Sequence, residues 1–507
     1  MDNTVYIGLT PHELWRHFGA LNRIPRPPGR EDAAREYVRR VAEYRGLKSI
    51  VDKAGNLLVY VPATDQVNTN AKVVAIQSHL DMVCEKTAGV EHDFDVDPIQ
   101  PRRIGDRIFG TGTTLGADDG VGVAAALSVV TTSGLRHGPL ELIFTVEEET
   151  GLYGAAGLET SLLSSRLLLN LDSEDPDGLT VGSAGGATMI ISIDASREKV
   201  APRWVGRELC VSGLKGGHSG VQIHERLANA IKLLTDTLTA ATSAGIEFRI
   251  GSLQGGTADN AIPRQCQAQL AMSQRSATEF DVFIREQQDA VVSAWNTAEP
   301  SVLVSSSSCS AARSAYSRDF GQNILALLME LPHGALEMSS AFPGNVETSS
   351  NLASVRTISD GVRITISARS LVEAQLNALF RRICKRAQRV EARVETFDRY
   401  PSWQPNLGSP LLNLADKVFR RLRGKAPAIQ VVHGGLECGF IVSKLPEMDA
   451  LSFGPLVRFA HTPGEYVAIS SVESMWQMLV QMLKALSEAC PCEVGHSSGK
   501  FTVSAMT

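Results

Sequence analysis

The feature that most constrains the fold is a series of short apolar stretches in the first third of the chain. The runs Ala71–Gln77, Leu140–Val146 and Leu167–Leu171 are rich in Val, Ile and Leu and do not alternate with polar residues. Such runs are typical of strands that are buried on both faces of a parallel sheet. Helical stretches, including 31–45 and Val121–Val130, lie between or beside them. We therefore predict an α/β fold with a mostly parallel sheet and flanking helices.

The pattern changes after the glycine-rich segment that ends at Gly186. From 187 to 399 the strands alternate more clearly, as in Gly361–Ala368, and helical stretches lie between them. Alternation is typical of a sheet with one solvated face. We therefore predict an inserted α+β domain over 187–399. It would interrupt an α/β domain that is formed by 1–186 and 400–507.

The C-terminal segment is predicted to contain mostly helices. Leu411–Arg423 favours a helix, Val457–Glu465 a loop, and Ser471–Ala489 a long amphipathic helix. The residues that follow are small and polar, so we expect a flexible C-terminal tail.

Charge and cysteine usage narrow the function classes. The formal net charge is −6 and no long basic run occurs, which disfavours nucleic acid or an anionic membrane surface as the main partner. The N-terminus lacks the layout of a secretory signal, and no stretch approaches the roughly 18 apolar residues that span a bilayer. The cysteines form no CxxC pair. These features predict a soluble, cytoplasmic protein with reduced thiols.

Polar motifs follow the predicted strands, where the ligand crevice of a parallel α/β sheet lies. A histidine and an aspartate follow the first strand, three glutamates follow the second, and an aspartate follows the third. An aspartate pair lies on a glycine-rich loop, and a second histidine occurs far along the chain. In chain order the motifs contain His79 with Asp81, Asp118 with Asp119, Glu147 to Glu149, Asp172, and His461.

Each motif alone has a simpler interpretation. A histidine near an aspartate is often structural, and an aspartate pair at a helix start favours the helix dipole. Three acids after a strand can form an exposed turn, and a lone histidine is usually an ordinary residue. Taken together, two histidines and several carboxylates, with no cysteine among them, supply the ligands that two zinc ions need.

The order of these motifs is similar to that of a known family. The resemblance rests on QSHLDMVCEK, TTLGADDGVGVA, FTVEEETGLYGA, LNLDSED, LKGGHSG, GGTADNAIPR, HGGLECG and HTPGE, and runs from about Leu9 to Ala489. These segments resemble the aminoacyl-histidine dipeptidases (peptidase D) of the co-catalytic dinuclear-zinc exopeptidase family. The resemblance implies hydrolysis of unblocked dipeptides, Xaa-His among them. It also implies that 1–186 and 400–507 form the catalytic domain and that the inserted domain, 187–399, is its lid. It also implies two Zn²⁺ per subunit, for which Mn²⁺ or Co²⁺ can substitute.

The resemblance also implies metal-ligand roles for the motif residues. It assigns His79 and Asp172 to one zinc ion, and Glu149 and His461 to the other. Asp118, the first of the aspartate pair, would bridge the two ions. The family often has a cis peptide bond after this aspartate.

The same resemblance assigns the groups that act on the substrate. Glu148 would be the general base and Asp81 the carboxylate behind His79, while Glu147 has no role. The spacing to Thr150-Gly151 favours this register. Five residues would contact the substrate: His218 as oxyanion donor, Asn260, Arg264 and Arg369 at its carboxylate, and Glu437 at its free amino group. A structural salt bridge is an alternative role for either arginine.

Two other functions remain open at this stage. An N-acyl amino-acid deacylase could use the same scaffold, and dependence on a free amine would separate it from a dipeptidase. A non-catalytic binding protein could use the lid for partner contacts, although the intact ligand set argues against it. Homodimers through the lid are common in the family, so a homodimer acting on a small dipeptide is expected.

Overall fold

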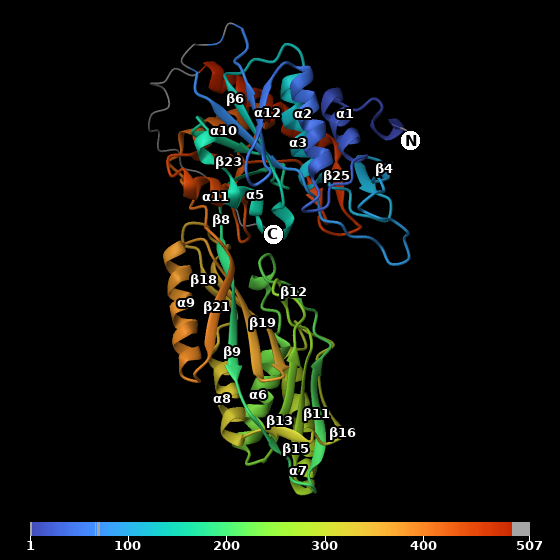
Figure 1. Cartoon of the computed structure of the whole chain (residues 1–507), viewed down its shortest axis with the longest axis vertical. Helices are drawn as coiled ribbons and strands as arrows, with labels where there is room; N and C mark the ends of the chain where they lie inside the picture. Colours follow the sequence, from blue (N-terminus) through green and yellow to red (C-terminus); the bar gives the residue numbers. More distant parts are fainter. Residues whose placement is uncertain (1–2, 66, 68–70, 489–507) are drawn as a thin grey trace. The chain divides into compact units, whose positions relative to one another are not determined.

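The computed structural model describes residues 3–65, 67 and 71–488, and the chain folds as two compact units (Figure 1). Unit 1 comprises Met1–Ser183 and Trp403–Thr507, and unit 2 comprises Ala184–Ser402. Unit 2 extends slightly beyond the lid expected from the sequence, because its strands begin at Gly185 and end at Tyr400. The predicted C-terminal tail lies outside the described residues.

A mostly parallel sheet forms the centre of unit 1. Its strand order is β1-β2-β6-β3-β7-β23-β8-β22. The pairs β3–β6, β3–β7, β7–β23 and β8–β22 are parallel, whereas β1–β2, β2–β6 and β8–β23 are antiparallel. The strands span β1 Lys48–Val51, β2 Leu57–Val61, β3 Val74–His79, β6 Leu140–Thr145, β7 Leu167–Asn170, β8 Gly178–Ser183, β22 Ala428–Val432 and β23 Asp449–Ser452.

Helices cover this sheet, and every residue of β3 and β6 is therefore buried. Helix α3 packs against β3, and α11 packs against β23. The helices are α1 His12–Leu21, α2 Asp32–Tyr44, α3 Ala117–Thr131, α4 Glu148–Gly151, α5 Tyr153–Gly157, α10 Pro410–Arg423, α11 Glu437–Lys444 and α12 Ile469–Glu488. Buried strands with covering helices confirm the predicted α/β class. None of the described helices has the length and apolarity that a bilayer span requires.

A small antiparallel sheet with strand order β24-β25-β5-β4 also belongs to unit 1. Its strands are β4 Pro101–Ile104, β5 Arg107–Gly110, β24 Val457–Arg458 and β25 Tyr466–Ala468. The prediction of a loop over Val457–Glu465 is therefore wrong at its start. Val457 and Arg458 pair with Val467 and Tyr466, which leaves 459–465 as the loop of a hairpin.

Unit 2 contains two copies of one βαββαβ arrangement, joined edge to edge. The first copy runs β11 Val205–Ser212, α6 Ala230–Ser243, β13 Arg249–Gly255, β15 Cys266–Met272, α7 Gln274–Trp295 and β16 Leu303–Cys309. The second runs β9 Gly185–Asp194, α8 Arg318–Glu330, β19 Val346–Ile358, β20 Gly361–Ser370, α9 Glu373–Gln388 and β21 Arg393–Tyr400.

The strand order β16-β11-β15-β13-β19-β20-β9-β21 shows the duplication. Counted along each copy, the order is 4-1-3-2 followed by 2-3-1-4, so the second strands, β13 and β19, meet at the junction. The first copy is inserted between β9 and α8 of the second.

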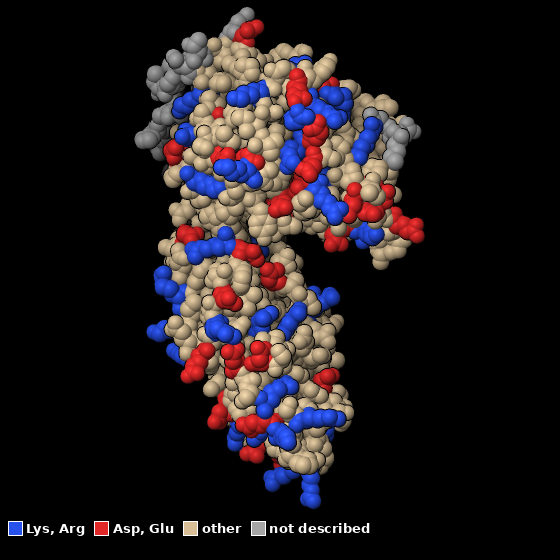
Figure 2. All heavy atoms as spheres, in the orientation of Figure 1, with Lys and Arg blue, Asp and Glu red and all other residues tan. Residues whose placement is uncertain are grey.

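The remaining elements are short. In unit 2, β12 Gly217–His218 pairs with β14 Ala261–Ile262, β10 Arg197–Lys199 with β17 Ser314–Tyr316, and β18 Gly334–Met338 with β19. Single 3-10 turns occur at Asn3–Tyr6, Thr160–Leu162 and Ile223–Glu225. On the face shown in Figure 2, basic and acidic side chains are interspersed over both units rather than separated into large fields.

Candidate metal centre

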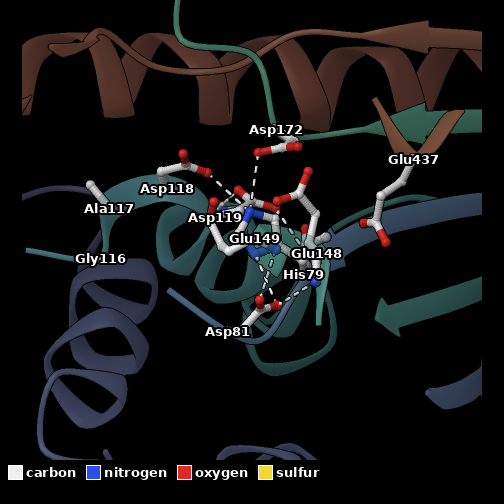
Figure 3. Close-up of polar contacts among 12 residues, drawn as sticks. His79, Asp81, Gly116, Ala117, Asp118, Asp119, Glu148, Glu149, Asp172 and Glu437 are labelled. Carbon is white, nitrogen blue, oxygen red and sulfur yellow. Dashed lines mark hydrogen bonds and ion pairs between the residues drawn. The ribbon is translucent and has the colours of Figure 1, made fainter. Parts of the chain in front are cut away.

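The polar motifs of unit 1 meet at the carboxyl ends of β3, β6 and β7. His79 is the last residue of β3, Glu148 and Glu149 begin α4 after β6, and Asp172 follows β7. In Figure 3 their side chains, with that of Asp118, surround a common space. This convergence follows from the parallel order β6-β3-β7, which brings three strand ends to one edge.

Two groups of possible ligand atoms share Asp118. One consists of His79, Asp118 and Asp172, and the other of Asp118, Glu149 and His461; within each group the candidate atoms lie within 4.8 Å of one another. His79 Nε2 is 3.0 Å from Asp118 Oδ1 and 3.4 Å from Asp172 Oδ1. His461 Nε2 is 3.2 Å from Asp118 Oδ2 and 3.1 Å from Glu149 Oε2. The two oxygens of Asp118 thus face different histidines.

The loop that presents Asp118 has an unusual backbone. Gly116 has a φ of 68°, and Asp118 and Asp119 depart from helical angles although they lie at the start of α3. The peptide bond between Asp118 and Asp119 is cis. Asp119 turns inward, where its carboxylate accepts hydrogen bonds from the N–H groups of His79 and Gly122 at 3.3 and 3.1 Å.

Asp81 connects His79 to the glutamates. Its Oδ1 is 3.5 Å from His79 Nδ1, and the carboxylate accepts hydrogen bonds from the backbone N–H groups of Glu148 and Glu149 at 3.1 and 3.0 Å. One buried carboxylate therefore lies behind the imidazole and also caps the short helix α4.

Carboxylates outnumber imidazoles in this cluster, and this excess of acidic groups shifts the pKa values of both kinds of side chain. Burial lowers the pKa of His79, but Asp172, Asp118 and Asp81 outweigh that effect and raise it well above its ordinary value. Hydrogen bonds to Asp118 and Glu149 raise the pKa of His461 to about 11. Burial, together with nearby carboxylates, raises the pKa values of Glu148 and Asp172 well above the usual range.

This set of donors fits divalent metal ions. It consists of imidazole nitrogens and carboxylate oxygens, which suit zinc, manganese or cobalt. Glu149 Oε1 is buried and has no hydrogen-bond partner among the described residues. An unpaired buried oxygen in a group of mutually repelling carboxylates is the environment that bound cations would stabilise.

The structure places Glu437 in unit 1 as well, at the first position of α11. Its side chain is fully buried, and its Oε2 accepts hydrogen bonds from Gln77 and from the hydroxyl of Thr145, the latter at 2.7 Å. Its Oε1 is buried without a hydrogen-bond partner in the described part of the chain. Burial, its largest influence, raises the pKa of Glu437 to about 7.

The other expected substrate contacts lie in unit 2. His218 pairs with Ala261 in the β12–β14 ladder, and the N–H of Ser219 donates to the carbonyl of Asn260 at 2.8 Å. Arg264 follows β14 and is exposed. The structure thus brings His218, Asn260 and Arg264 onto one small substructure, whereas Arg369 lies on β20 of the large sheet.

The hydrogen bonds of His218 and Arg369 bear on the substrate roles expected for them. His218 Nδ1 accepts hydrogen bonds from the N–H groups of Gly220 and Val221 at 3.2 and 3.1 Å. A neutral His218 ring therefore carries its proton on Nε2. The Nε of Arg369 is buried with no hydrogen-bond partner within the described residues.

Sequence reasoning gave no role to two buried charged residues next to the cluster. Glu465 is 2% exposed and accepts backbone hydrogen bonds from the Asp118 loop, and Arg26 is also 2% exposed and donates to the same loop. Glu465 lies in HTPGE, one of the segments that carried the family resemblance, but a charged residue in such a motif has no obvious partner until the fold is known.

Fold and site together define a class of protein: a two-unit α/β protein with a cluster of histidines and carboxylates at the edge of its central sheet. The chain belongs to the peptidase family M20/M25/M40, which matches residues 75–485. The predicted family and enzyme class are thereby confirmed.

Individual relatives agree with this membership. The chain is 36% identical to the cytosol non-specific dipeptidase of Escherichia coli (strain K12) over 94% of its own length and 98% of that protein. It is similar to the crystal structure of aminoacylhistidine dipeptidase from Vibrio alginolyticus, with a TM-score of 0.85, 32% identity, and coverage of 96% and 99% of the two chains. Aminopeptidase PepT from Bacillus cereus shares the fold, with a TM-score of 0.55, 17% identity, and coverage of 95% and 100%.

Proposed function

We propose that this protein is a dinuclear metallo-dipeptidase that hydrolyses unblocked dipeptides, Xaa-His dipeptides among them. The observation that carries the proposal is the pair of ligand groups that share Asp118, with Glu148 beside them. The names of the Escherichia coli and Vibrio alginolyticus relatives support a dipeptidase over a deacylase. The Escherichia coli relative is named as a dipeptidase of the cytosol, which also supports a cytoplasmic location.

In this proposal His79 and Asp172 would hold one metal ion, Glu149 and His461 would hold the other, and Asp118 would be shared by both. Zinc ions bound there would lower the pKa of a shared water and polarise the scissile carbonyl. Manganese or cobalt would suit the same donors.

Glu148 is the proposed general base. It follows β6 directly, and its backbone is fixed because its N–H donates to Asp81. Burial is the largest cause of its raised pKa. Glu148 would take the proton of the attacking water and then deliver it to the departing amine.

Substrate recognition is proposed for residues of both units. A His218 with its proton on Nε2 would donate to the developing oxyanion. Arg369, whose Nε is buried and has no hydrogen-bond partner among the described residues, would bind the terminal carboxylate, together with Asn260 or Arg264. Glu437 would attract the free amino group. A homodimer also remains part of the proposal.

Metal analysis combined with a dipeptide panel tests this function. Chelation should abolish hydrolysis of a Xaa-His dipeptide, and two equivalents of Zn²⁺ per chain should restore it. The N-acetylated form of the same dipeptide should not be cleaved. Cleavage of the blocked form in preference to the free one would favour the deacylase instead.

A further inference from the structure

The hairpin loop that carries His461 is attached to the Asp118 loop by one buried carboxylate. We define the His461 loop as 459–465, between β24 and β25, and the Asp118 loop as Leu115–Asp118. Glu465 Oε2 accepts hydrogen bonds from the N–H groups of Leu115 and Gly116 at 2.7 and 3.0 Å. Its Oε1 accepts from those of Ala117 and Asp118 at 2.7 and 3.4 Å. One side chain thus binds four successive amides.

Hydrogen bonds inside the His461 loop define its conformation but do not fix its position relative to the Asp118 loop. The N–H and hydroxyl of Thr462 both donate to the carbonyl of Phe459, and the N–H of Glu465 donates to the carbonyl of Thr462. The loop is anchored at its base by the pairing of β24 with β25. The Glu465 side chain leaves this turn and fixes it against residues that are nearly 350 positions away in the sequence.

Arg26 also binds the Asp118 loop and attaches it to the segment that follows His79. Its guanidinium donates to the carbonyls of Leu80 and Asp81 at 2.8 and 2.7 Å, and to that of Gly116 at 2.5 Å. The segment that follows His79 is therefore tied to the Asp118 loop through Arg26. The peptide groups flanking Gly116 are held from both sides, with Glu465 on the N–H and Arg26 on the carbonyl.

We propose that Glu465 is a positioning residue that sets the Asp118–Glu149–His461 group in place for its metal ion, while Arg26 holds the Asp118 loop against the segment that follows His79. The inference rests on the proposed dinuclear function. Groups that orient metal ligands typically change metal affinity by about 10–100-fold when they are removed. In a variant that lacks the Glu465 carboxylate, Arg26 still holds the Asp118 loop against the segment that follows His79, whereas the His461 loop loses its attachment. The loss should therefore weaken the metal position of His461 far more than that of His79.

Cobalt titration of the chelator-treated full-length protein tests this assignment. We expect Glu465→Gln to bind its first Co²⁺ as the wild type does and its second about 10–100-fold more weakly, as measured by calorimetry. The visible spectrum of the singly loaded variant should match that of His461→Ala and differ from that of His79→Ala. Glu473→Gln is the matched control, because it makes the same change at an exposed position on α12.

Each outcome decides between defined alternatives. Wild-type affinity for both ions in Glu465→Gln, or equal weakening of both in a folded variant, would overturn the inference alone. A wild-type protein that binds fewer than two Co²⁺ would overturn the proposed function and the inference with it. If Glu465→Gln does not fold, hydrogen exchange in the metal-free wild type answers the question. Protected amides at Gly116 and Ala117 are expected, and exchange at open-chain rates would contradict the role of Glu465.

Discussion

The two halves of the candidate metal centre share Asp118 but differ in how deeply they are built into the protein. The His79 half is assembled from strand ends at the middle of the sheet, and the side chains of His79 and Asp172 are only 1% and 7% exposed. The His461 half depends on a hairpin loop, and the side chain of His461 is 55% exposed. The first half is thus part of the core of unit 1, and the second is completed at its surface.

Because of this difference in burial, the two histidines differ in how much they affect folding and in what fixes their position. Removal of a buried imidazole from among carboxylates destabilises the fold, because their charge is then left uncompensated where water cannot reach it. An exposed imidazole contributes little to folding, because solvent screens its ion pairs. The exposed half therefore needs a separate means of fixing its position, which is the role inferred for Glu465.

The largest effect is expected at Glu148, which would serve both halves. Glu148→Ala should lower kcat for a Xaa-His dipeptide by about 10²–10⁴-fold, because proton transfer in the transition state is lost. Binding of two Co²⁺ should persist, because Glu148 belongs only to a third possible group, with His79 and Glu149, and not to the two groups that share Asp118. Steady-state kinetics and calorimetry on the same sample measure both quantities.

Glu147→Ala is the matched control for that variant. Glu147 precedes the base directly and makes its backbone hydrogen bond to Glu31 rather than to Asp81. Its removal should leave kcat within a few-fold of the wild type. A comparable loss in both variants would contradict the assignment of Glu148.

Alanine substitutions at the two histidines should differ in their effect on the free energy of unfolding. His79→Ala should lower the free energy of unfolding of the metal-free protein by about 3–5 kcal/mol, because buried carboxylates lose their cationic partner. His461→Ala should change it by less than about 1 kcal/mol, because the side chain is exposed. Urea unfolding at neutral pH gives both values, and equal losses would remove the distinction between the halves.

A substitution in the shared loop should affect both halves together. A Cβ at Gly116 would lie 2.5 Å from Arg26 Nη2 and 2.7 Å from Met82 Sδ, at a φ of 68°. Gly116→Ala should destabilise the protein by about 1–3 kcal/mol and weaken both Co²⁺ positions. Gly134→Ala is the control, because its φ is 79° but nothing lies within 4 Å. Undisturbed metal binding in Gly116→Ala would show that the loop does not couple the halves.

The sequence predicted the buried half of the centre more readily than its surroundings. His79, Glu148 and Asp172 each follow an apolar run, so strand periodicity and the parallel-sheet rule were enough to place them together. His461 follows no such run. Its expected place came from the family resemblance, and its hairpin was predicted as a plain loop because strands of two or three residues leave no periodic signal.

Arg26 and Glu465 show why the rest could not be predicted. Both side chains bond to backbone groups, so neither the identity nor the spacing of their partners is written in side-chain patterns. The duplication in unit 2 was hidden for a related reason. It is a repeat of strand order, interrupted by insertion of one copy into the other, and not a repeat of residues.

The smallest effect concerns a buried acid on the His79 side. Glu437 is linked to β3 through Gln77, and burial raises its pKa to about 7. An acid with a raised pKa is neutral below that value and charged above it, so attraction of the substrate ammonium should be lost as the pH falls through 7. Between about pH 8 and pH 6, the ionised fraction of such a group falls about tenfold, and kcat/KM for an unblocked dipeptide should fall with it.

Glu437→Gln distinguishes this titration from that of the metal centre. The amide cannot ionise, so its kcat/KM should be low at pH 8 and should lack the component near 7, whereas Glu473→Gln should keep the wild-type profile. Co²⁺ binding by Glu437→Gln should be unchanged, because Glu437 is in none of the three possible ligand groups. A variant profile that superimposes on that of the wild type would mean that the free amine is recognised elsewhere, and the exposed His461 half would then be the place to search.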